Sequence, residues 1–185
     1  MLNIFFPSNI IHIKFKQKMK ITSAEQIFNN CKWVDEHSLV FDLHSALFKR
    51  TFKVLLDFDP DKTQKTIRKE TLLSISDFQS LKEDEISKIY DGMWEYVISL
   101  HKGQLKTNDK GKSWIPLTLE DHLKNLKLKD KEDPIEKCPI TGVGFYNDDD
   151  MDHSYFMIWM SPEWDGEHGL TAFYYNGILD HVGID

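Results

Sequence analysis

Apolar and polar residues alternate along two neighbouring segments, 38–44 and 51–58, and this alternation predicts two strands. In the first segment Leu39, Phe41 and Leu43 occupy every second position, which is the period of a strand with one buried face. Few residues separate the two segments. We therefore expect an antiparallel hairpin here.

The strongest periodic pattern predicts one long amphipathic helix over residues 77–102. Ser76 and Gln79 have the spacing of a capping box at its start, and Gly103 offers a left-handed stop at its end. The other side of the helix is charged and is interpreted as a solvated surface. The apolar side includes Phe78, Leu81, Ile86, Ile89, Tyr90, Met93, Trp94, Val97, Ile98 and His101.

Two shorter helices are predicted on either side of this one. A Thr or Ser ahead of Glu25 or Gln26 resembles a capping box, and it predicts one or two helical turns within residues 22–30. Residues 118–121 start another short helix that ends near Leu126, after a polar loop over 104–112.

The last third of the chain has the pattern of a β-meander. Asn176-Gly177 separates two apolar runs, and both residues tolerate the positive φ of a tight hairpin turn. The polar stretches between the other runs are expected to form turns. Strands are predicted over residues 140–146, 155–160, 170–175 and 178–184.

These elements predict an α+β fold, in which an antiparallel β-sheet packs on one long amphipathic helix plus short helices. A chain of 185 residues with 41% hydrophobic content is long enough to bury a core and short enough for one domain. We expect residues 19–185 to form that domain. Residues 1–18 are expected to form a poorly ordered extension, because their lysines follow the apolar run instead of preceding it as in a secretory signal.

The net charge of −7 disfavours nucleic acid as a partner, since phosphate binding requires a basic face. A basic protein partner is more compatible with this charge. The apolar run in residues 1–18 is too short for stable membrane insertion. Cys31 and Cys138 are far apart and form no CxxC pair, so they are interpreted as buried thiols in a reducing cytoplasm.

The loop between the predicted strands 155–160 and 170–175 is the best candidate for a site. It carries Trp164, Asp165, Glu167 and His168 on a connection held by two strands. Carboxylate and imidazole groups can bind metals or act as acid and base near neutral pH.

The ligand count of this loop is short for a catalytic zinc, and convergence of His153 or His181 would require a strand register that is not evident from sequence. Alternatively, Asp165 bonds backbone amides of its own turn, Gly169 takes a strained backbone angle and His168 bonds locally.

Other motifs do not indicate chemistry. The acidic run 148–153 has carboxylates for a hard cation but lacks the glycine and glutamate of an EF-hand, so a solvated turn is favoured. Gly142 and Gly144 form only a GxG, without the rest of a phosphate-binding loop. Cys138 has no basic neighbour except Lys137 that would activate its thiol. No catalytic residue, metal site or cofactor is predicted from these motifs.

The residues Trp164, Asp165, Glu167, His168, Gly169 and Leu170 resemble the W-D-x-E-H-G-L signature of an uncharacterised bacterial family, a domain of unknown function. The resemblance extends more loosely from about residue 35 to the end. Members of this family are sometimes encoded near polymorphic toxin systems, which implies an immunity or accessory role. No catalytic residue is established for the family, so none is transferred.

The sequence thus favours a non-enzymatic, cytoplasmic binding protein, such as an immunity protein that blocks the surface of a toxin. Opposite charge would speed its encounter with a basic partner. The competing hypothesis is a hydrolase or metal-dependent enzyme centred on Asp165, Glu167 and His168. A purely structural module of a larger assembly is the third.

Overall fold

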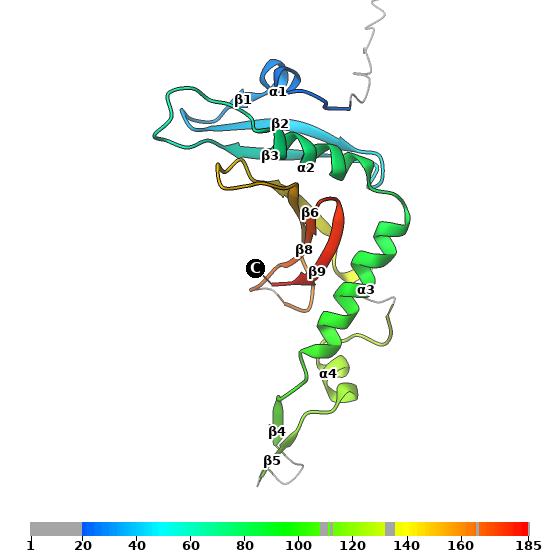
Figure 1. Cartoon of the computed structure of the whole chain (residues 1–185). Helices are drawn as coiled ribbons and strands as arrows, with labels where there is room; N and C mark the ends of the chain where they lie inside the picture. Colours follow the sequence, from blue (N-terminus) through cyan, green and yellow to red (C-terminus); the bar gives the residue numbers. More distant parts are fainter. Residues whose placement is uncertain (1–19, 108–110, 112, 132–135, 166, 185) are drawn as a thin grey trace, which may run out of the picture.

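The computed structural model describes residues 20–107, 111, 113–131, 136–165 and 167–184, so the predicted extension 1–18 lies outside the described residues. Helices and strands alternate irregularly along the chain, and the α+β class is confirmed (Figure 1). The elements are α1 (Ala24–Asn30), β1 (Lys32–Trp33), β2 (Ser38–Ser45), β3 (Arg50–Asp57), α2 (Lys69–Ser80), α3 (Asp84–Ser99), β4 (Leu105–Thr107), β5 (Trp114–Pro116), α4 (Leu119–Asn125), β6 (Ile140–Phe145), β7 (Tyr155–Met160), β8 (Leu170–Tyr175) and β9 (Ile178–Gly183).

The strands form three antiparallel sheets. The predicted hairpin is confirmed as β2 and β3, with β1 added at its edge. The four predicted C-terminal strands are confirmed as a meander of order β6-β7-β8-β9. Asn176 and Gly177 have φ of 49° and 73°, as a turn with two positive φ values requires. The third sheet is the small hairpin β4-β5.

Helix α2 packs against both larger sheets. The ring of Phe78, which is fully buried, lies 5.7 Å from that of Phe52 on β3 and 5.8 Å from those of Phe145 on β6 and Phe156 on β7. Aromatic pairs at this edge-on geometry add to the stabilisation from burial. One helix therefore joins the core sides of two sheets.

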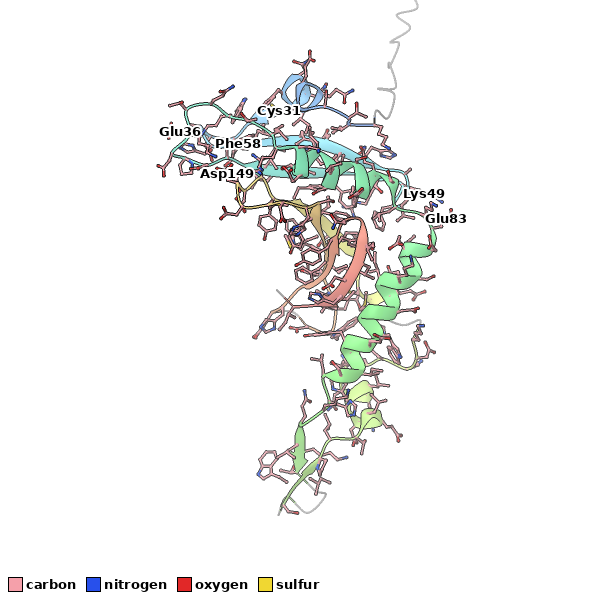
Figure 2. All side chains as sticks on the ribbon, viewed as in Figure 1. Cys31, Glu36, Lys49, Phe58, Glu83 and Asp149 are labelled. Carbon is pink, nitrogen blue, oxygen red and sulfur yellow. The ribbon has the colours of Figure 1, made fainter. Side chains whose placement is uncertain are left out.

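The prediction of one long helix is wrong, because the chain turns at residues 81–83 and forms α2 and α3 instead (Figure 1). Leu81 leaves the helical conformation with ψ of 140°. Glu83, labelled at this corner in Figure 2, is followed by two further carboxylates in the first turn of α3, where the helix dipole favours negative charge. The break lets α2 reach both larger sheets while α3 packs on β9, where Gly92 approaches Val182.

The predicted capping box of Ser76 and Gln79 is also wrong, since both residues lie inside α2. The side chain of Gln79 instead accepts a hydrogen bond from Ile21 N at 3.0 Å. The capping boxes of the shorter helices are present, with Ser23 and Gln26 at α1 and Thr118 and Asp121 at α4. Gly103 has the predicted left-handed conformation, with φ of 79°.

Strand β4 lies in the segment 104–112 that was predicted as a loop, and the hairpin that it forms with β5 projects away from the larger sheets (Figure 1). Each strand has only three residues, which is too short for a periodic signal. Trp114 on β5 is 69% exposed. The described residues include no helix that is long and apolar enough to cross a membrane.

Candidate functional site

The loop that carries Trp164, Asp165, Glu167 and His168 connects β7 to β8, and backbone hydrogen bonds hold its first half. Ser161 N donates to Pro139 O at 3.0 Å, and Glu163 N donates to Lys137 O at 2.7 Å. The side chain of Trp164 is half-buried and packs against the hydrophobic core. Trp164 therefore anchors the loop to the domain interior.

Asp165 organises the second half of this loop. Its Oδ1 accepts hydrogen bonds from the backbone N–H of Glu167 and of His168, both at 3.1 Å, and lies 3.2 Å from Nδ1 of His168. Partial burial acts to raise the pKa of Asp165, but the bonds from Glu167 and His168 outweigh it and hold this pKa below its usual range. This geometry corresponds to the second hypothesis for this loop, in which Asp165 bonds backbone amides of its own turn.

The other two histidines considered for this site each contact the aspartate that precedes them in the sequence. His153 Nδ1 lies 2.6 Å from Asp152, and His181 Nδ1 lies 2.7 Å from Asp180. Gly169 does not have the positive φ that the alternative reading included, so that detail is wrong. Within the described ranges, His, Cys, Asp and Glu side chains nowhere gather in threes in a way that could hold a metal.

The acidic loop 147–153 connects β6 to β7 and is tied to α2, which the sequence did not indicate. Arg68 Nη1 donates to Asp149 Oδ1 at 2.9 Å and Nη2 donates to Met151 O at 3.1 Å, while Lys62 forms a second ion pair with Asp149. Figure 2 labels Asp149 on this loop. Asp148, Asp149, Asp150 and Asp152 are all exposed, which agrees with the interpretation as a solvated turn, but Asp149 is in addition ion-paired with Arg68 and Lys62.

Sequence reasoning missed an aromatic surface on the side of the β6-β9 sheet that faces away from α2 and α3. We call this surface the outer face. The strand register places its residues in three rows across the sheet. The first row contains Tyr155, Tyr175 and Ile178, with Tyr146 just beyond the end of β6; the second contains Gly144, Met157, Phe173 and His181; the third contains Gly142, Trp159, Thr171 and Gly183.

The rings of the first row form a connected series with His153, and the second row contains a separate stacked pair. Tyr155 lies 5.3 Å from Tyr146 and 4.8 Å from Tyr175, and His153 lies 5.5 Å from Tyr175, measured between ring centroids. In the second row His181 stacks on Phe173 at 4.4 Å with an interplanar angle of 17°. Trp159, Tyr175 and Tyr146 are each about 40% exposed, at 41%, 39% and 39%. A signal was present in the sequence: β7 and β8 carry apolar residues on both of their faces.

Gly142 and Gly144 make room for Trp159 on this face. A Cβ at Gly142 would lie 2.7 Å from the indole, and one at Gly144 would lie 2.6 Å from it. Such distances are not tolerated by packed carbon atoms. The GxG pattern thus seats an aromatic ring on the backbone of β6.

Gly144→Ala is expected to lower the free energy of unfolding by about 1–3 kcal/mol, because the new methyl group displaces the Trp159 ring. Urea unfolding monitored by circular dichroism measures this loss. The control is the same change in a Trp159→Ala background, where the indole that the new methyl group would meet is absent. There Gly144→Ala should cost clearly less than in the wild type. Equal costs in the two backgrounds would contradict this assignment.

Charge is segregated along the chain. All 23 Lys and Arg residues lie at or before Lys137, whereas nine of the 30 Asp and Glu residues lie after it. The β6-β9 sheet and its loops therefore carry acidic side chains without a single Lys or Arg of their own. Asp149 is neutralised by Arg68 and Lys62 from the preceding segment. The other carboxylates in the loops at both ends of the outer face include Asp148, Asp150, Asp152, Glu163 and Glu167, which are exposed.

Cys138 is fully buried and burial raises the pKa of its thiol to about 12, so this cysteine is not an activated nucleophile. His122 is also buried, and its Nε2 lies 3.0 Å from Val97 O, where it joins α4 to α3. Both side chains are therefore interpreted as part of the packing of the fold.

No curated protein and no solved structure is significantly similar to the chain. A family model described as a domain of unknown function, DUF6985, matches residues 42–184. This range begins within β2 and includes β3, both long helices, the loop between β7 and β8 and the whole outer face. The chain therefore belongs to the DUF6985 family of domains of unknown function.

Proposed function

We propose that the protein is a non-enzymatic binding protein whose partner is a basic protein. The observation that carries this proposal is the segregation of charge, which leaves the β6-β9 sheet and its loops acidic and without Lys or Arg. A surface of one sign attracts a partner of the other sign and raises the rate of their association. In this proposal, residues 19–185 form one cytoplasmic domain that binds neither nucleic acid nor membranes.

An immunity protein that neutralises a toxin is the form of this proposal that the family resemblance implies. Such a protein acts by covering the surface of its partner, so it requires an exposed binding face and no catalytic group. Basic toxins, such as nucleases, would match the acidic sheet.

The alternative, hydrolytic or metal-dependent chemistry at Asp165, Glu167 and His168, has less support. Oδ1 of Asp165 already accepts backbone hydrogen bonds from residues of its own turn. A carboxylate in that role stabilises the turn, and ligation of a metal by the same atom would compete with those bonds.

Co-expression with the product of the neighbouring gene tests the proposal. We expect a complex that survives affinity purification, with a dissociation constant that increases at least about tenfold between low and high salt because charge dominates the encounter. Isothermal titration calorimetry at two salt concentrations measures this change. Absence of a complex at micromolar concentrations would count against the proposal, and a complex insensitive to salt would count against its electrostatic basis.

A further inference from the structure

The outer face of the β6-β9 sheet is the part of the acidic region where rings are also exposed. Phe78 of α2 contacts Phe145 and Phe156, whose side chains point to the opposite side of this sheet. Gly92 of α3 approaches Val182, which also points to that opposite side. Both long helices thus lie behind the sheet, and Trp159 and Tyr175 remain accessible on its front.

We propose that the outer face binds an extended, arginine-rich segment of a protein partner. This inference rests on the proposed function, because it names the surface and the chemistry by which a basic protein would be held. Trp159 and Tyr175 would receive guanidinium groups on their ring faces, and the carboxylates at the two ends of the strands would pair with the flanking charges.

The arrangement of rings supports a cationic occupant. The six-membered ring of Trp159 lies over the Gly142 and Gly144 positions, so its side toward the sheet is occupied by backbone. A cation on the outward side of an indole is attracted by the quadrupole of the ring. Tyr175 offers a second ring, in contact with Tyr155 at 4.8 Å.

Arginine fits this surface better than lysine. The guanidinium group is planar, stacks on aromatic rings and still donates in-plane hydrogen bonds to carboxylates. Rings occupy the floor of the outer face, and carboxylates lie in the loops that begin and end β7. A residue type that serves both groups at once is therefore favoured.

Charge argues against two other occupants. Single-stranded nucleic acid also stacks on exposed rings, but its phosphates would be repelled by the exposed carboxylates in the loops at both ends of this face, of which Asp149 is paired with Arg68 and Lys62. A second copy of the chain, paired through the same face, would bring like carboxylates together. A basic protein segment meets neither obstacle.

The test uses the full chain and a fluorescein-labelled peptide of alternating arginine and serine, nine residues long, with fluorescence anisotropy as the readout. We expect the wild-type protein to bind this peptide, and Trp159→Ala to weaken binding about tenfold through loss of the cation–π contact. Tyr175→Ala is expected to act in the same direction, and it serves as a second variant should Trp159→Ala disturb folding.

Matched controls separate this face from the rest of the surface. Trp114→Ala removes an even more exposed indole on β5, and it should leave the affinity within about twofold of the wild type because it lies outside the outer face. Asp152→Asn should weaken binding, whereas Glu25→Gln on α1, which removes the same charge elsewhere, should not. The lysine version of the peptide should bind more weakly than the arginine version.

Several outcomes would overturn the inference. These are equal affinities for Trp159→Ala and Trp114→Ala, tighter binding of an oligothymidine than of the peptide, and a wild-type dimer that Trp159→Ala dissociates. Peptide binding that appears only after removal of residues 1–18 would also overturn it, since this basic segment would then be the occupant. If the co-expressed partner binds the wild type and both tryptophan variants equally, this surface is wrong while the proposed function stands; if no basic partner binds, the proposed function itself fails.

Discussion

Phe78→Ala is expected to lower the free energy of unfolding by about 3–5 kcal/mol, the largest loss among the single changes considered for this chain. Phe78 is fully buried, and its ring contacts Phe52, Phe145 and Phe156. Removing it leaves a cavity between the β1-β2-β3 sheet and the β6-β9 sheet. The neighbours are anchored in strands, so they can close this cavity only in part.

Chemical denaturation monitored by far-ultraviolet circular dichroism measures the loss. Leu73→Ala is the matched control, because Leu73 lies on the same helix but is 44% exposed, and it should cost less than about 1 kcal/mol. Two separate unfolding transitions in the wild-type protein would contradict the central position of Phe78, since the two sheets would then unfold independently of their shared contact.

The longer strands, β2, β3 and β6 to β9, were predictable because their signals are local. Leu39, Phe41 and Leu43 are all fully or almost fully buried, as their alternation predicted. Asn176-Gly177 fixes the β8-β9 turn through backbone conformation, which requires no knowledge of the remaining fold. Alternation of apolar and polar residues and a two-residue turn can both be recognised from a few neighbouring residues.

The helix prediction failed because two helices in succession share one apolar period. Residues 77–80 and 84–98 continue the same pattern across the break, so periodicity alone does not reveal it. The carboxylates of Glu83 and Asp84 were assigned to a solvated face, although with Glu85 they form a cluster that also favours a helix start. Tertiary packing decides between these readings, since α2 and α3 contact different sheets.

Only the local half of the candidate site was predictable. Asp165 bonds residues two and three positions away, and such turns are encoded by the aspartate itself. The outer face, in contrast, depends on register, because Trp159 pairs with Gly142 and Thr171, and Tyr155 pairs with Tyr175. Phe173 is buried and Trp159 is exposed, and only the pairing of β7 with β8 shows that both side chains lie on the same face of the sheet.

The second large effect is expected for Asn147→Ala, which should lower the free energy of unfolding by about 2–3 kcal/mol. Asn147 Oδ1 accepts from Arg68 N at 3.0 Å and lies 2.9 Å from the hydroxyl of Thr71, while Nδ2 donates to Thr66 O at 3.1 Å. Arg68 is the N-cap of α2 and has no capping bond from its own side chain. Asn147 therefore accepts a hydrogen bond from the N-cap N–H of α2, although it lies on a distant loop. In a capping box, a glutamate or glutamine side chain of the helix itself accepts this bond.

Thermal unfolding should detect the Asn147→Ala change as a decrease in Tm of about 4–12 °C for a domain of this size. Asn147→Asp separates the contributions: it keeps the acceptor for Arg68 N and Thr71 but removes the donor to Thr66, so an intermediate loss is expected. Because Asn147 also positions the loop of Asp148, Asp150 and Asp152, Asn147→Ala should weaken binding of the arginine peptide under conditions where the variant remains folded. A variant as stable as the wild type would contradict the capping role, and a destabilised variant with unchanged peptide affinity would show that this loop does not contribute to the outer face.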